Sequence, residues 1–271
     1  MKRPPTESDL LTGFELLNLR GDYREYFKTK RNNFFATMQE LPDLWKCFQL
    51  LDQIWIRQFN DLQNLGDTKQ MLPGLLFMNA HAKFRIAMEL GFCCCLGEAW
   101  DILRGAIESV AHAHKLVREP HLMKVWLEKD DGKRAAEAFK DTFERNKKES
   151  LFPAQHGLDK LHTIYSQFSE WGTHTTVASI AQKFATCETS SHVEWKLNYT
   201  GAEPQVLTTS LFLMLVASAL MERAFYGTYE ARLQFDTELN RMRSSLREEA
   251  GIIRARTIKQ FNLRPPEIWS V

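Results

Sequence analysis

An 18-residue run without a charged side chain, Pro204 to Met221, constrains the fold of this chain more than any other segment. The run includes four hydroxyl side chains and is at the short limit for a helix that spans a bilayer. A helix that is apolar on every side has to be buried, and other helices of the same chain can bury it. We therefore expect a central core helix that begins at Pro204 and continues to about Tyr229.

Most of the remaining chain has apolar residues three and four positions apart, which is the period of a helix with one buried face. The expected helices are Tyr23 to Pro42, Pro42 to Gly66, Pro73 to Phe92, Leu96 to Val117, Lys133 to Lys147, Leu158 to Phe168 and Phe235 to Phe261. Proline suits the first position of a helix, and glycine suits its end. Several long helices with short connections imply an all-α fold, a bundle of long antiparallel helices.

Residues 148–203 are less regular and form a predicted insertion. In this insertion, Val193, Trp195 and Leu197 alternate with polar residues, which indicates a strand and a small irregular or hairpin element around 186–200. We expect an N-terminal arm at residues 1–20 and a single helical-bundle domain at residues 21–271 that contains the insertion.

The composition argues against several classes of protein. The chain has 35 Lys and Arg against 34 Asp and Glu, so its net charge of +1 gives no general electrostatic reason to bind nucleic acid or membranes. The five cysteines fit neither a disulfide framework nor a zinc site in their spacing, so we expect buried free thiols. The first ten residues have charges and no apolar signal segment, and we expect a cytoplasmic protein without a membrane partner.

Two of the expected helices have polar residues four positions apart, on faces that a bundle would bury. One helix contains His81, Arg85 and Glu89, and the next contains Arg104 and Glu108. Charges buried in this way have to be paired and hydrogen-bonded. One interpretation is a structural network of Arg–Glu contacts that fixes the register of the two helices. The other is a pocket, in which Arg104 binds an anion with its planar guanidinium and Glu108 or a histidine transfers a proton.

A segment of the insertion completes the predicted pocket. Tyr165 and Ser169 share a helix face, and His174 follows on a loop. No Glu–His spacing matches a di-iron bundle and no motif matches a nucleotide-binding loop, so we expect neither a metal nor a cofactor. The candidate catalytic residues are Arg104, Glu108, His112 and His174, and the candidate ligand-binding residues are His81, Arg85, Glu89, Tyr165 and Ser169.

Basic residues gather in the last expected helix, although the whole chain is nearly neutral. They are Arg241, Arg243, Arg247, Arg254, Arg256, Lys259 and Arg264. A solvated helix face is one interpretation of this pattern, and contact with the phosphates of an RNA is the other.

Two short runs of residues carry a resemblance. They are Glu98, Ala99, Arg104 and Glu108 on one expected helix, and Tyr165, Ser169 and His174 downstream. These runs resemble those of bacterial proteins in a helical family of unknown function, which have an EA…R…E run on a long helix and a Tyr…Ser…His run after it. The resemblance covers about residues 75–230. It implies a bacterial, all-helical protein with a shared polar cluster, and it brings no known activity.

A more distant similarity is to the HEPN superfamily of helical ribonucleases and nucleotide-binding domains. Their signature is an arginine followed, after four to six residues, by a histidine. Here Arg104 and His112 are separated by seven residues, which departs from that signature. The similarity implies a metal-independent endoribonuclease in stress or phage defence, with Arg104 and His112 at its site.

Together these observations predict a helical protein whose interior polar pocket binds a small anionic ligand or a partner. The HEPN-like endoribonuclease that acts on RNA is the first alternative. The second is a helical homodimer with a purely interaction role, formed through the aromatic residues of the expected helix Pro42 to Gly66.

Overall fold

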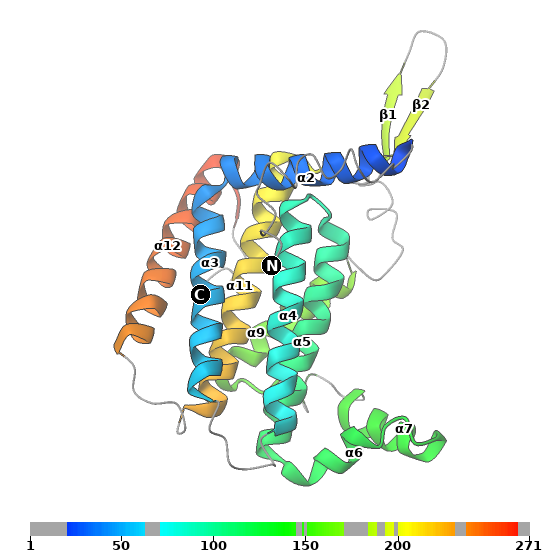
Figure 1. Ribbon diagram of the computed structural model, residues 1–271, viewed down its shortest axis with the longest axis vertical. Coiled ribbons are helices and arrows are strands. Elements are labelled where there is room, and N and C mark those ends of the chain that lie inside the picture. Colours follow the sequence, from blue (N-terminus) through cyan, green and yellow to red (C-terminus); the bar gives the residue numbers. More distant parts are fainter. Residues whose placement is uncertain are drawn as a thin grey trace, which may run out of the picture.

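The computed structural model describes residues 21–62, 71–144, 148, 151–170, 184–188, 193–197, 200–230 and 237–264. These residues form an all-α bundle, which confirms the predicted fold class (Figure 1). Its long helices are α2 (Asp22–Glu40), α3 (Pro42–Asp61), α4 (Met71–Phe92), α5 (Leu96–Arg118), α11 (Pro204–Tyr229) and α12 (Thr237–Phe261).

The predicted core helix is confirmed as α11. It packs against α3, α4, α5, α9 and α12, so these helices surround it. Its length and composition would also allow it to cross a membrane, but 72% of its most apolar stretch is buried inside the protein. This degree of burial is typical of the central helix of a bundle. At Gly91 of α4, an added Cβ would come within 2.9 Å of the Leu211 side chain, so glycine permits the close approach of α4 to α11.

Helix α2 differs in direction from the helices below it. Figure 1 shows α2 lying across one end of the bundle, whereas α3 and α4 run along the bundle axis. The predicted boundary at Pro42 explains the change of direction, because proline has no N–H to continue α2 and suits the first position of α3. The backbone N–H of Leu41 still closes the last turn of α2 by donating to the carbonyl of Thr37 at 2.9 Å.

Three consecutive cysteines make the turn between α4 and α5. Cys94 has a left-handed backbone with φ of 62°, and its N–H donates to the carbonyl of Gly91 at 2.9 Å. The N–H of Cys95 donates to the carbonyl of Leu90, also at 2.9 Å, which completes a Schellman motif. Burial raises the pKa of the Cys93 thiol to about 12, so this thiol stays protonated at neutral pH. Cys47, Cys93, Cys94 and Cys95 are free thiols, and all of them except the half-buried Cys94 are buried.

The shorter elements connect or flank the long helices. They are the 3-10 turns η2 (Pro120–Leu122) and η4 (Gln155–Gly157), the helices α6 (Met123–Leu127), α7 (Lys133–Phe139) and α9 (Leu158–Phe168), the π-helical turn η3 (Lys140–Glu144), and the strands β1 (Phe184–Glu188) and β2 (Val193–Leu197). Of these, α9 packs against α5 and α11. The strands pair antiparallel, as the predicted hairpin requires. The charged helix expected from Lys133 to Lys147 ends as an α-helix at Phe139 and continues as a π-helical turn. The expected stop at Gly66 lies outside the described residues.

Candidate functional site

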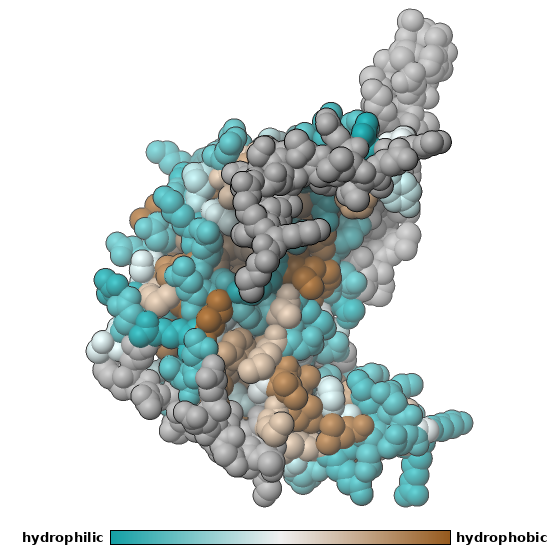
Figure 2. All heavy atoms as spheres, in the orientation of Figure 1, coloured by the Kyte–Doolittle hydropathy of each residue, from teal (hydrophilic) through white to brown (hydrophobic). Residues whose placement is uncertain are grey.

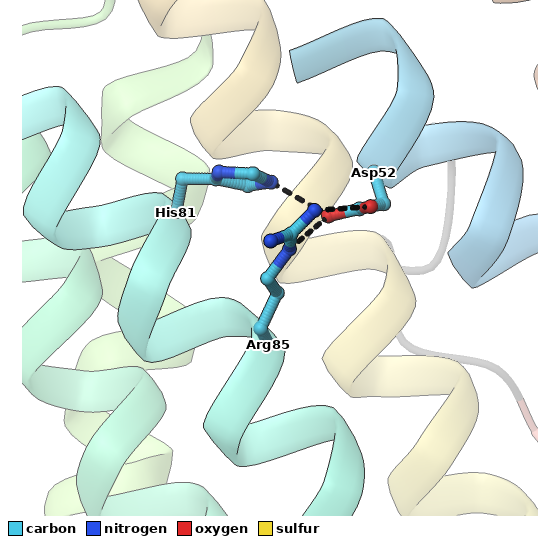
Figure 3. Close-up of polar contacts among 3 residues, drawn as sticks. All are labelled: Asp52, His81 and Arg85. Atoms are coloured by element: carbon cyan, nitrogen blue, oxygen red, sulfur yellow. Dashed lines mark hydrogen bonds and ion pairs between the residues drawn. The ribbon is translucent and has the colours of Figure 1, made fainter. Parts of the chain in front are cut away.

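Three polar side chains from α3 and α4 meet in a connected cluster, which we call the Asp52 triad: Asp52, His81 and Arg85 (Figure 3). Arg85 binds Asp52 with two hydrogen bonds, Nε to Oδ1 at 2.6 Å and Nη2 to Oδ2 at 2.8 Å. His81 Nε2 lies 2.7 Å from the same Oδ1. The side chain of Arg85 is 50% exposed and that of His81 is 10% exposed, so the triad extends from the core to the surface.

Aromatic packing fixes the histidine of the triad. The His81 ring stacks on Trp55 with centroids 5.5 Å apart, and on Phe84 at 6.0 Å. One face of α4 therefore presents His81 and Arg85, one turn apart, toward the same residue of α3. The sequence placed His81 and Arg85 on one helix face, as observed, but the carboxylate that joins them is Asp52 of α3, to which the sequence interpretation assigned no role.

The charge states of the triad follow from its geometry. Burial raises the pKa of Asp52, but the hydrogen bonds from Arg85 and His81 outweigh it, so this pKa lies below its usual value. Burial lowers the pKa of His81, and attraction to Asp52 does not fully offset that effect. The hydrogen bond to Asp52 raises the pKa of Arg85. At neutral pH, an ionised Asp52 therefore accepts hydrogen bonds from a charged Arg85 and from the Nε2–H of a neutral His81.

A groove with a volume of about 730 Å³ opens beside the triad, between α2, α3 and α4. This α2–α4 groove falls within the size range of sites for small organic ligands. Its lining residues are Phe27, Lys30, Arg31, Phe34, Phe35, Trp45, Phe48, Gln49, Asp52, Arg85, Met88, Glu89 and Cys93. The groove exists because α2 crosses the bundle end after the turn at Pro42 and faces α3 and α4 across a gap that aromatic rings line.

Arg85 keeps hydrogen-bonding capacity for a ligand. Its two bonds to Asp52 use Nε and Nη2, and within the described residues Nη1 has no partner. Glu89, predicted to act with His81 and Arg85, also lines the groove. The aromatic wall is held by edge-to-face packing of Phe34 on Trp45, with centroids 5.6 Å apart. The groove thus combines a fixed apolar wall with a guanidinium that is already oriented.

The predicted catalytic residue Arg104 lies in a different cluster, between α5 and α9. Its Nη1 donates to the hydroxyl of Tyr165 at 3.2 Å, and its Nε lies 3.4 Å from Oδ1 of Asp101. The structure therefore brings Arg104 and Tyr165 together, as the sequence interpretation expected. Glu108 contributes more weakly, by raising the pKa of Arg104 after the larger effects of burial, Tyr165 and Asp101.

The expectation that Arg104 and Glu108 face the bundle interior needs correction. The Arg104 side chain is 27% exposed and Glu108 is half-buried, although their neighbours Trp100 and Ile107 are in the core. The helix turns by about 100° per residue, so an apolar residue at each side does not place the residue between them in the core. Arg104 lies at the rim of the α5–α9 contact, where it meets Tyr165.

The other predicted site residues are spread over the fold. His112 is buried, accepts a hydrogen bond at Nδ1 from the indole N–H of Trp126 at 3.3 Å, and packs against Phe143. Ser169 donates to the backbone carbonyl of Tyr165 at 2.9 Å, within its own helix. His174 lies outside the described residues. The single pocket predicted from nine residues thus becomes a triad with a groove, a cluster around Arg104, and a buried histidine.

Sequence reasoning also missed a buried carboxylate, Glu222 of α11. Glu222 accepts hydrogen bonds from Gln58 and from Nη2 of Arg243, the latter at 3.3 Å, and lies 3.1 Å from Arg243 Nε. Burial raises the pKa of Glu222, although Arg243 and Gln58 act in the opposite direction. The available signal was its position, because Glu222 directly follows the uncharged run and continues the same buried helix.

The sequence also contains a signal for Asp52, which interrupts the apolar stripe of α3. The apolar stripe of α3 contains Trp45, Phe48, Trp55 and Phe59, and Asp52 occupies the position of that stripe between Phe48 and Trp55. A carboxylate at such a position needs a cation from a neighbouring helix.

The basic pattern of α12 is partly explained by pairing within the protein. Arg241 contacts Glu238 at 2.7 Å, Arg256 contacts Asp43 at 2.8 Å, and Arg243 contacts Glu222. These contacts favour the interpretation of α12 as a packed and solvated helix over that of an RNA-binding surface.

The predicted dimer surface on the aromatic residues of α3 also needs correction. Phe48 and Trp55 are fully buried against the rest of the bundle, so they are not available to a second chain. Exposed apolar residues lie on several helices, and those of α4 are Met71, Leu75, Met78 and Ile86. Figure 2 shows hydrophobic side chains gathered on the face of the bundle where Figure 1 places α4.

Among the described residues, no group of three or more His, Cys, Asp or Glu side chains is placed to hold a metal ion. Comparison of the chain with known protein families, with curated proteins and with solved structures found no match. The resemblance to a bacterial helical family and the HEPN-like alternative therefore stay predictions.

Proposed function

We propose that this protein is a binding module, and that its α2–α4 groove takes an organic anion with an apolar body. The observation that carries the proposal is Arg85, half-exposed on an aromatic-lined groove and oriented by Asp52. The proposal assigns Arg85 to the anionic group and the rings of Phe34, Phe35 and Trp45 to the apolar body.

The apolar part of the ligand is argued from the walls of the groove. Phe27 and Phe35 are 38% and 42% exposed, so a ligand that covers them removes apolar surface from water. Burial of apolar surface contributes about 25 cal/mol per Å². Rings that are already packed against one another lose little conformational freedom on binding, which favours affinity.

The anionic part is argued from the charges of the groove. Lys30, Arg31 and Arg85 line it together with Asp52 and Glu89. The Asp52 carboxylate is already hydrogen-bonded to Arg85 and His81. The other charged residues of the groove are Lys30, Arg31 and Glu89, so its net charge is positive. A guanidinium binds carboxylates, sulfonates and phosphates through its planar array of N–H groups, which suits an anionic ligand at this position.

Anilinonaphthalene sulfonate is a suitable probe, because it joins a sulfonate to fused rings and its fluorescence rises in an apolar site. We expect saturable binding to the native protein. Arg85→Gln should weaken that binding about tenfold or more, which corresponds to the loss of one hydrogen bond to a charged group. Because Arg85→Gln also frees Asp52, the double variant Asp52→Asn/Arg85→Gln separates the lost guanidinium from the exposed carboxylate.

Two controls address non-specific binding of the probe. Lys46→Gln removes an exposed lysine of α3 that does not line the groove, and Leu75→Ser removes an exposed apolar side chain of α4. Both variants should bind the probe within twofold of the native protein. Equal affinity in Arg85→Gln, or a loss in Leu75→Ser as large as that in Arg85→Gln, would exclude the groove as the binding site.

A further inference from the structure

A second polar site lies between α11 and α12, away from the groove. A small cavity there is lined by Ala219, Leu220, Glu222, Arg223, Arg243, Leu246 and Arg247. Three arginines of this set surround one carboxylate that is almost fully buried, at 4% exposure. Neither the fold nor the proposed groove ligand requires this concentration of positive charge.

The central arginine is held in a fixed orientation. Arg243 binds Glu222 side-on, through Nε at 3.1 Å and Nη2 at 3.3 Å, and its guanidinium lies 3.8 Å from the centroid of the Tyr226 ring. Within the described residues, Nη1 of Arg243 has no hydrogen-bond partner. This is the arrangement of Arg85 on Asp52, repeated in a more buried place.

The other two arginines leave the positive charge uncompensated. Within the described part of the chain, neither Arg223 nor Arg247 forms an ion pair, and both are exposed at the mouth of the cavity. The single carboxylate, Glu222, is already bound by Arg243 and Gln58. Three guanidiniums that line one cavity with a single carboxylate repel one another, and an anion between them would relieve that repulsion.

The size of the cavity limits the ligand. The cavity has a volume of about 30 Å³ that is open to the centre of a water-sized sphere. One water molecule needs about 10–15 Å³ of such volume. The space therefore suits a small oxyanion, and it is too small for the body of an organic ligand.

We propose that Arg223, Arg243 and Arg247 form a site for a small tetrahedral oxyanion such as inorganic phosphate, with Glu222 as the residue that positions Arg243. The proposal is independent of the α2–α4 groove. Arg247 and Arg243 lie one turn apart on α12, and Arg223 approaches from α11, so the bound anion would link the two helices.

The test is isothermal titration of the native protein with inorganic phosphate at constant ionic strength. We expect one saturable site. Arg223→Gln and Arg247→Gln should each weaken phosphate binding at least tenfold, because each removes a charged donor and leaves the Glu222–Arg243 pair intact. The matched control is Arg241→Gln, which removes an exposed arginine of the same helix that contacts Glu238 and does not line the cavity.

Arg241→Gln should bind phosphate within twofold of the native protein. Absence of saturable binding to the native protein would overturn the proposal. So would unchanged affinity in both Arg223→Gln and Arg247→Gln, or a loss in Arg241→Gln equal to theirs, because the effect would then be general attraction to a basic helix.

Discussion

Two arginine–carboxylate pairs of this protein have the same bonding pattern and opposite surroundings. Arg85 binds Asp52 through Nε and Nη2 at the edge of the α2–α4 groove, with side chains 50% and 22% exposed. Arg243 binds Glu222 through the same two atoms between α11 and α12, with side chains 11% and 5% exposed. The chemistry is shared, so differences in behaviour report the effect of burial.

The comparison shows that burial reverses the direction in which the pKa of the carboxylate is shifted. Asp52 keeps access to water, and its hydrogen bonds hold its pKa below the usual value. Burial raises the pKa of Glu222 despite similar bonds. An exposed pair contributes little to stability and can serve binding, whereas a buried pair is costly to break.

The largest effect is expected from breaking the buried pair. Arg243→Met leaves the carboxylate of Glu222 in the core without its cation and should lower the free energy of unfolding by about 3–5 kcal/mol. The matching change at the groove, Arg85→Met, should cost about 0–1 kcal/mol, because that pair is exposed. Urea denaturation of both variants measures the difference. Similar losses in the two variants would contradict the comparison, and Glu222→Gln/Arg243→Met should recover part of the larger loss.

The next effect compares His81 of the Asp52 triad with His114 of α5, a more strongly shifted histidine outside both pairs. Burial lowers the pKa of His81, but Asp52 partly offsets this, whereas His114 of α5 has a pKa lowered to about 4 by burial and by Arg118 and His156. Neutral His114 therefore stabilises the fold above pH 6.5, and this stabilisation is lost as the pH falls to about 4.

Between those pH values, the native protein should lose about 3 kcal/mol more of its unfolding free energy than His114→Gln does. Denaturation curves at several pH values measure the two slopes. Parallel slopes for the native protein and His114→Gln would show that this histidine does not titrate differently in the folded and unfolded states.

A smaller effect is the pH dependence of stability, which should have opposite signs for the two carboxylates. Asp52 has a lowered pKa, so its contribution to stability is present above about pH 3.8 and is lost as the pH falls through the folded pKa. Glu222 has a raised pKa, so its contribution is present below about pH 4.5 and is lost as the pH rises through the folded pKa. Relative to the native protein, Asp52→Asn should become less destabilised as the pH falls below 3.8, and Glu222→Gln should become relatively more stable as the pH rises above 4.5. If the stability of both variants relative to the native protein changed in the same direction with pH, the contrast between Asp52 and Glu222 would be contradicted.

The smallest effect is expected in the cluster at α5 and α9. Tyr165→Phe removes the acceptor of the Arg104 hydrogen bond and keeps the ring under the guanidinium, whose Cζ lies 5.7 Å from the ring centroid. Because Arg104 is partly exposed and water can replace the hydroxyl, the loss of stability should be about 0.5–1 kcal/mol. Thermal unfolding provides the measurement. A loss of unfolding free energy above about 2 kcal/mol would show that the Arg104–Tyr165 hydrogen bond behaves as a buried one and would contradict this expectation.

The helices were predictable because their signals are local. The start of α11 at Pro204 and its end at Tyr229 match the expected bounds, and Pro42 separates α2 from α3 as expected. Each boundary depends on the backbone chemistry of residues close in sequence, which the printed sequence contains. The length of the charged helix after Lys133 was less predictable, because a run of polar residues has no apolar stripe to mark its end.

The sites were less predictable because they depend on pairing between distant helices. His81 and Arg85 were recognised from their spacing, but their common partner, Asp52, comes from another helix and was assigned no role. The direction of α2 decides that a groove lies beside them, and no pattern within α2 encodes its crossing. The partners of Glu222 are likewise Gln58 and Arg243, which are far from it in sequence.

The most direct test of the proposed binding function is a crystal structure of the protein with anilinonaphthalene sulfonate. We expect the sulfonate at hydrogen-bonding distance from Nη1 of Arg85, about 2.7–3.2 Å, with the naphthalene rings against Phe34 and Trp45 and with Asp52 still holding Nε and Nη2. A probe bound elsewhere, with the α2–α4 groove empty at saturating concentration, would contradict the account.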